Sequence, residues 1–188
     1  LTAGAHVTLI AGPGVARSKD AIKRIDVCSA EEMLDQVMRE MPKTDLFISV
    51  AAVADYKAKT ISANKIKKRD LAKTSPRIEL EETPDIIRCV ASMKERPLVI
   101  GFAAETNNAV QNAKIKLKDK NLDAIVVNDV SRKDIGFESN ENEVIFVSGT
   151  KERAIAKTDK VSLSRELIDI IYSEFRVNLE KRHSARLG

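Results

Sequence analysis

The chain has 188 residues, 43% of them hydrophobic and 32% charged, with a formal net charge of +4. This length suits a single globular domain that buries about two-thirds of its unfolded surface, and no apolar run is long enough to cross a bilayer. Cys28 and Cys89 are the only cysteines. Two are too few for a disulfide framework, which favours a reducing compartment, the cytoplasm, and we expect both to be small core residues.

Positive charge is concentrated in one stretch. Between Tyr56 and Arg77 there are eight lysines and arginines and a single acid, Asp70, so this stretch carries +7 and the rest of the chain −3. A charge run is often only solvated surface, but it also suits a site that meets an anion. Ile66, inside the run Lys65-Ile66-Lys67-Lys68, would give such a loop an apolar anchor. We expect this stretch to have little regular structure.

The first third of the chain predicts short strands around one helix. Apolar residues at 7–10 and 24–27 indicate two strands. Ser29 and Glu32 have the spacing of a capping box, and the apolar residues after them recur on one helical face until Pro42. These features predict an α/β protein in which strands alternate with helices.

Residues 45–56 combine a predicted strand with a predicted ligand site. Leu46–Val50 is an apolar run that predicts a buried strand, and it leads into Ala51, Ala52 and then Asp55. Ligands of open α/β sheets bind at the carboxyl ends of strands. Small residues there leave peptide N–H groups accessible, and an acid can hold a cation or a hydroxyl. An alanine-rich turn with a surface acid is the alternative.

The middle of the chain repeats this pattern. A strand predicted over Pro97–Gly101 continues into Phe102 and small residues that end at Glu105. Before it, Thr83 as the N-cap and Pro84 at the first helical position predict a helix. The start of that helix could receive a phosphate or the polar edge of a base, although capping explains the residues equally well.

The last part of the chain predicts a helix, strands and a longer helix. In the helix at about 107–120, four lysines form two i,i+4 pairs on different faces, 114 with 118 and 116 with 120, and periodicity does not say which pair faces a ligand. A strand follows at 122–127, then an antiparallel hairpin of 143–147 with 153–156, and a final helix over 162–181.

Several of these stretches together resemble phosphopantothenoylcysteine synthetase (phosphopantothenate–cysteine ligase), in its bacterial, CTP-dependent form. The strings that carry the resemblance are Ala51-Ala52-Val53-Ala54-Asp55-Tyr56, Lys65-Ile66-Lys67-Lys68, Thr83-Pro84-Asp85-Ile86, Gly101-Phe102-Ala103-Ala104-Glu105-Thr106, Lys116-Leu117-x-x-Lys120-x-x-Asp123, Asn128-Asp129 and Gly136-Phe137. Each string is weak alone, but the combination is specific and covers nearly the whole chain.

The resemblance implies a three-layer, Rossmann-like α/β fold with a mostly parallel sheet and a C-terminal antiparallel hairpin plus helix. It implies a ligase of coenzyme A synthesis that activates 4′-phosphopantothenate with CTP as an acyl-cytidylate and joins it to L-cysteine, releasing CMP and pyrophosphate. Mg²⁺ is expected on the triphosphate. A homodimer with the hairpin region at its interface, and fusion to or association with a flavin-dependent decarboxylase domain, are further implications.

The resemblance also implies residue roles. Lys65 matches the family's catalytic and nucleotide-binding lysine on a mobile flap, Ala51 and Ala52 match positions at the acyl-cytidylate, and Asp55 lies at the nucleotide or its Mg²⁺. The remaining nucleotide-binding positions are Pro84, Asp85, Ile86 and Phe102, which line the base and ribose, and Lys116 and Lys120, which hold the nucleotide.

The family pattern also has an N-terminal strand and an Asn-x-Ser-Ser-Gly segment without a counterpart here, so we expect residues 1–188 to be a single nucleotide-binding ligase domain lacking that part. An ATP-using form of the same ligase is one alternative. A nucleic-acid-binding module using residues 56–77 is another, although only five Phe and two Tyr are available for stacking. A nicotinamide-dependent dehydrogenase would need a Gly-rich fingerprint that is missing. We expect small-molecule substrates and no nucleic-acid or membrane partner.

Overall fold

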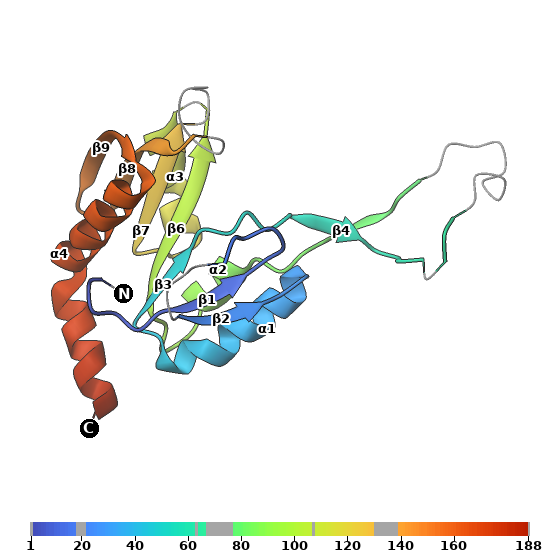
Figure 1. Ribbon diagram of the computed structural model, residues 1–188, viewed down its shortest axis with the longest axis horizontal. Coiled ribbons are helices and arrows are strands. Elements are labelled where there is room, and N and C mark those ends of the chain that lie inside the picture. The colour runs from blue at the N-terminus through green and yellow to red at the C-terminus, as the bar shows by residue number, and fades with distance from the viewer. Residues whose placement is uncertain are drawn as a thin grey trace.

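A five-stranded sheet in the order β3-β6-β7-β8-β9 forms the centre of the computed structural model, which describes residues 2–17, 22–62, 64–66, 77–106, 108–129 and 139–187 (Figure 1). Three strands are parallel, namely β3 (Leu46–Ser49), β6 (Leu98–Glu105) and β7 (Ala124–Asp129). The hairpin of β8 (Glu141–Ser148) and β9 (Glu152–Asp159) continues the sheet antiparallel to β7.

Helices cover both faces of this sheet. α1 (Ala30–Glu40), α2 (Ile86–Ala91) and α3 (Ala109–Asp119) pack on one face, and α4 (Lys160–Leu187) packs on the other. No described helix is long and apolar enough to cross a membrane.

Side chains of the strands alternate between the two faces, as the pleat requires. Val99 and Ile125 join the cluster beneath α1, α2 and α3, whereas their neighbours Ile100 and Val126 join the cluster beneath α4. The sheet is therefore a middle layer with a core on each side. This confirms the predicted three-layer α/β fold with a parallel centre and a C-terminal hairpin plus helix.

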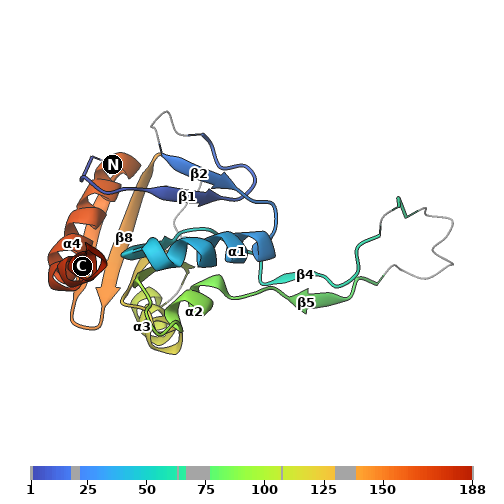
Figure 2. The ribbon, with the colours of Figure 1, turned by 90° about the horizontal axis from the view of Figure 1, so that it is seen from below.

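A second, two-stranded parallel sheet of β1 (Thr8–Ala11) and β2 (Lys23–Asp26) lies on the α1 side of the molecule (Figure 2). The predicted capping box joins β2 to α1. The Ser29 hydroxyl accepts the Glu32 N–H at 3.1 Å, and the Glu32 carboxylate accepts the Cys28 N–H at 2.7 Å. α1 ends in a short 3₁₀ helix, η1 (Met41–Lys43), at Pro42.

The expectation of little regular structure over 56–77 is wrong at the start of that stretch. β4 (Tyr56–Ala58) pairs antiparallel with β5 (Leu80–Glu82), and the two strands form a ribbon that projects from the body (Figures 1 and 2). At the base of the ribbon, Lys57 forms ion pairs with Glu31 of α1 and with Glu81 at 3.2 Å. Residues 63 and 67–76 lie outside the described residues.

Two burial predictions are also wrong. β3 is an edge strand whose residues are only half-buried, and Val50 beyond it is 63% exposed, because among the described strands only β6 pairs with it. Cys28 and Cys89 are exposed. Cys28 precedes the N-cap of α1, and Cys89 lies on the exposed side of α2, next in sequence to the buried Val90.

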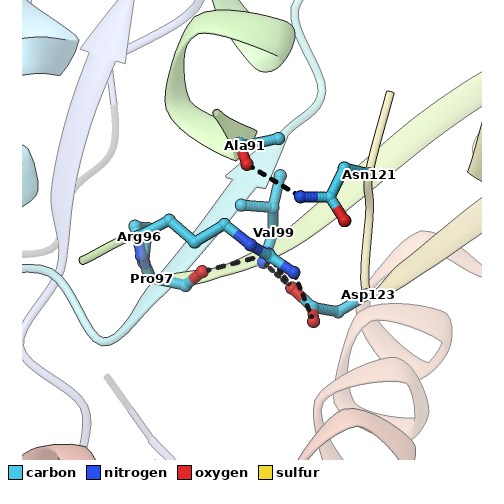
Figure 3. A network of polar contacts seen from close by, with 6 residues as sticks. All are labelled: Ala91, Arg96, Pro97, Val99, Asn121 and Asp123. Atoms are coloured by element: carbon cyan, nitrogen blue, oxygen red, sulfur yellow. Dashed lines mark hydrogen bonds and ion pairs between the residues drawn. The ribbon is translucent and has the colours of Figure 1, made fainter. Parts of the chain in front are cut away.

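A polar network fixes the amino ends of β6 and β7 (Figure 3). Arg96 makes a two-point contact with Asp123, with Nη1–Oδ2 at 2.5 Å and Nη2–Oδ1 at 3.1 Å, and Asp123 also accepts the Val99 N–H at 2.7 Å. The Asn121 side chain donates to the Ala91 carbonyl at 3.0 Å. The turn from α3 into β7 is thereby joined to both β6 and α2.

We predict that Asp123→Ala destabilises the fold, because it leaves Arg96 and the Val99 N–H without their shared acceptor. Losing the partner of part-buried donors costs about 1–3 kcal/mol. Urea unfolding followed by circular dichroism measures the change. Asp119→Ala is the control, since this exposed carboxylate on α3 accepts no bond from a described residue. Equal stability of the two variants would contradict a structural role for the network.

Candidate functional site

A cavity of about 220 Å³ lies at the carboxyl end of β3, beside the middle of β6. Its walls are the segment after β3, the turn that leads into α2, the middle of β6 and one face of α3. This is the edge of a parallel sheet at which α/β proteins bind ligands. The pocket therefore lies where the two strand-then-small-residue patterns predict a site.

The pocket brings together eight of the ten predicted site residues, which are Ala51, Asp55, Pro84, Asp85, Ile86, Phe102, Lys116 and Lys120. Ala52 is adjacent in sequence but is exposed and does not line the cavity. Lys65 is exposed and lies in the sequence after β4 and before β5, in the projecting part of the chain that we call the arm. Gly136 and Phe137 lie outside the described residues.

Thr83 joins two walls of the pocket, a role that the sequence analysis missed. Its hydroxyl donates to the Ala54 carbonyl, and its N–H donates to the Asp55 carbonyl at 2.9 Å. The prediction of Thr83 as a helix N-cap is wrong because its hydroxyl is used in this contact. Asp85 caps α2 instead, accepting the Arg88 N–H at 3.1 Å.

The start of α2 is thus occupied by a carboxylate. α2 has only six residues, and Asp85 takes one of its free N–H groups. A second anion is disfavoured beside this charge. Asp85 suits a hydrogen-bond donor of a ligand, such as a ribose hydroxyl or a base amino group, better than a phosphate.

α3 turns one of its two lysine pairs toward the pocket. Lys116 and Lys120 line the cavity, whereas Lys114 forms an ion pair with Glu152 of β9 at 2.6 Å. Of the two pairs, 116 with 120 is therefore the one that faces the cavity. Each pocket lysine has an acidic partner: Lys120 Nζ lies 2.9 Å from Asp85 Oδ2, and Lys116 Nζ lies 2.5 Å from Glu105 Oε1.

Both acidic partners are stabilised in their charged forms. The hydrogen bond from Lys116 lowers the pKa of Glu105, with a smaller contribution from Asn112, and outweighs the effect of burial. Burial acts to raise the pKa of Asp85, but bonds from Lys120 and the Arg88 N–H together bring it below its ordinary value. Both carboxylates are therefore charged at neutral pH.

β6 forms the floor of the pocket, and it is longer than predicted. It remains paired with β7 as far as Glu105, so Phe102 and the small residues after it lie within the strand. A Cβ on Gly101 would lie 3.0 Å from Leu122 and 3.2 Å from Ile87, which makes glycine the residue that fits this close packing. Phe102 is 37% exposed and offers an aromatic surface to a ligand.

Asp55 is the lining residue best suited to a metal ion. It is exposed at the pocket, and its carboxylate accepts no bond from a described residue. The described residues contain no group of three His, Cys, Asp or Glu that could hold a metal. Mg²⁺ commonly takes only one or two carboxylates when phosphates supply its other ligands. A single exposed carboxylate suits a metal ion whose other ligands come from a bound phosphate.

Residues 1–175 match the family model described as the DNA/pantothenate metabolism flavoprotein C-terminal domain. The chain belongs to this family. The chain is 42% identical over 166 residues to the coenzyme A biosynthesis bifunctional protein CoaBC of Vibrio vulnificus (strain YJ016), an alignment covering 88% of this chain and 41% of that protein. Identity to the protein of the same name from Escherichia coli (strain K12) is 39% over 173 residues, covering 92% and 43%.

A solved structure also matches this member of the DNA/pantothenate metabolism flavoprotein C-terminal domain family. The crystal structure of the C-terminal domain of a coenzyme A biosynthesis bifunctional protein CoaBC superposes with a TM-score of 0.75 at 31% identity, covering 93% of this chain and 77% of that chain. The fold is therefore that of the family. The chain spans less than half the length of the curated relatives it matches.

Proposed function

We propose that this chain is the ligase domain of a phosphopantothenate–cysteine ligase in coenzyme A biosynthesis, and that CTP is its co-substrate. The observation that carries the proposal is that a single pocket is lined by eight of the ten residues to which the family resemblance assigns a role. The relatives, named for coenzyme A biosynthesis, support the same pathway.

The proposed reaction has two steps. A carboxylate oxygen of 4′-phosphopantothenate attacks the α-phosphorus of CTP, and pyrophosphate leaves as the acyl-cytidylate forms. The amine of L-cysteine then attacks the acyl carbon, CMP leaves with the bonding electron pair, and the nitrogen loses a proton as the amide forms. The protein positions the reactants and stabilises the charge that develops on the phosphates.

The pocket suggests how the nucleotide would lie. The cytosine would contact Phe102 and Pro84, while the Asp85 carboxylate would accept a hydrogen bond from the ribose or the base amino group. Lys116 and Lys120 would hold the nucleotide, Lys116 by facing a phosphate oxygen. The backbone at Ala51 and the adjacent Ala52 would border the acyl group. The lining positions of these residues support this arrangement, apart from Ala52, which rests on the resemblance.

The charge of the pocket indicates that a triphosphate needs further cations. The two lining lysines are matched by the lining carboxylates Asp55 and Asp85, so the described pocket has no surplus of positive charge. We propose that Mg²⁺, which the triphosphate and Asp55 would hold, would supply part of the missing positive charge and offset negative charge on the phosphates. Lys65 and its neighbours in the basic stretch would supply the rest.

The assembly and location follow the same proposal. β9 is the edge strand of the central sheet among the described strands, which supports a homodimer that uses the hairpin region. The bifunctional relatives support a natural protein in which this domain is joined to a flavin-dependent decarboxylase. We propose a cytoplasmic location, since a chain with only two cysteines suits a reducing compartment.

The direct test is a pyrophosphate-release assay on the complete natural polypeptide that contains this chain. With 4′-phosphopantothenate, L-cysteine and Mg²⁺ present, we expect release with CTP and little with ATP. Omission of 4′-phosphopantothenate is the control, because no carboxylate is then available to attack. Release with ATP alone would assign the ATP-using form. Absence of release with every nucleotide would contradict the ligase.

Lys65 gives the second prediction. Lys65→Gln should leave formation of the acyl-cytidylate largely intact and slow its capture by cysteine about a hundredfold, the usual effect of losing one well-placed group that stabilises developing charge. Single-turnover quench experiments follow intermediate and product separately. Lys59→Gln is the control, since Lys59 lies on the same arm and forms an ion pair with Glu79 at 3.7 Å. Equal, mild losses in both variants would indicate a solvated basic arm in which Lys65 has no special role.

A further inference from the structure

Each lysine of the pocket is already neutralised within the protein. Lys116 contacts Glu105 at 2.5 Å, and Lys120 contacts Asp85 at 2.9 Å. Asp55 also lines the pocket, so three carboxylates lie near its two lysines. A nucleotide phosphate that approaches α3 must therefore compete with carboxylates for the same ammonium groups.

Glu105 differs from the other two acids in its position. It does not line the cavity, and its side chain is only 12% exposed at the end of β6. Asn112 of α3 donates to its second oxygen at 2.9 Å. Glu105 is thus held from two sides behind the pocket wall and is not available to a ligand itself.

Lys116 is the movable member of the pair. Its side chain is 46% exposed and lines the cavity, and its ammonium group is carried on a flexible four-carbon stem. The ammonium group has three N–H donors that can point to different acceptors. It can therefore turn from the Glu105 carboxylate toward a phosphate oxygen, or be shared between them.

We propose that Glu105 is an internal counter-ion that competes with the nucleotide phosphate for Lys116 and thereby weakens nucleotide binding. This inference rests on the proposed function, since it concerns the same pocket. Glu105 is a positioning residue, because it touches Lys116 and not the nucleotide. Nucleotide binding replaces the Lys116–Glu105 ion pair by a Lys116–phosphate ion pair. The net free energy of binding is therefore less favourable than the Lys116–phosphate contact alone would give.

Weaker nucleotide binding would help an enzyme that must release CMP after each two-step ligation. CTP enters and CMP leaves through the same contacts with α3. Tight binding of both gives no benefit once the enzyme is saturated, whereas release of product limits the turnover of many enzymes. A built-in counter-ion lets Lys116 be neutralised as soon as the product departs.

The test replaces Glu105 by Gln in the complete natural polypeptide. Glu105→Gln keeps the size of the side chain and an oxygen that can accept from Lys116, but it removes the charge. We expect the dissociation constants of CMP and of Mg²⁺–CTP to fall about two- to fivefold, the effect of one part-exposed ion pair. Binding should also become more sensitive to salt, because the unmatched lysine attracts phosphate more strongly. Isothermal titration at two salt concentrations measures both effects.

Glu152→Gln is the matched control. Glu152 of β9 forms an ion pair at 2.6 Å with Lys114, which lies on α3 as Lys116 does. Neither Glu152 nor Lys114 lines the pocket. The chemical change is identical, but we expect nucleotide binding to be unchanged. A second test combines Glu105→Gln with Lys116→Gln, and the tightening should disappear when Lys116 cannot provide the charge.

Weaker or unchanged nucleotide binding in Glu105→Gln would overturn the proposal, since the carboxylate would then act only to orient Lys116. If Glu105→Gln proves unstable, Glu105→Asp draws the carboxylate back from Lys116 with its charge kept, and should tighten binding by a smaller factor. Absence of CMP and CTP binding by the wild-type protein would contradict the proposed function itself. Wild-type binding without an effect of Glu105→Gln would contradict this inference alone.

Discussion

The site depends on the parallel pairing of β3 with β6. Their register, Leu46 opposite Leu98 through Ser49 opposite Gly101, places the carboxyl end of β3 beside the middle of β6. The chain after β3 and the middle of β6 then border one cavity, and Thr83 closes it by bonding to the carbonyls of Ala54 and Asp55. If β3 were antiparallel or shifted, the residues after it would leave the pocket.

Charge is divided between two parts of the molecule. In the body, the pocket lysines of α3 are balanced by Asp85 and by Glu105 behind the wall. The excess of positive charge lies in the basic stretch between Tyr56 and Arg77. This division suits a pocket that recognises the nucleoside part of a ligand, with additional cations required only for a polyphosphate. A permanently cationic pocket would instead hold every phosphate, product included.

Much of the fold could be predicted because it depends on local patterns. Apolar runs located the strands of the central sheet, and the spacing of Ser29 and Glu32 gave the start of α1. What failed depended on contacts between distant segments. Asp85 caps α2 because the Thr83 hydroxyl reaches across to Ala54, and β4 exists because residues some twenty positions later return to pair with it. The exposed positions of both cysteines likewise depend on which face each segment turns outward.

The residues that line the cavity could largely be predicted from the sequence, but their ion pairs could not. Motif resemblance gave eight lining residues, whereas the ion pair of Lys116 with Glu105 forms only when α3 packs beside the end of β6. The most direct test of a nucleotide site in this pocket is NMR titration of the labelled chain with Mg²⁺–CTP. Saturable shifts should concentrate at the amides of Ala51, Asp55 and Phe102. Shifts confined to the far end of the sheet, or none at all, would contradict the account.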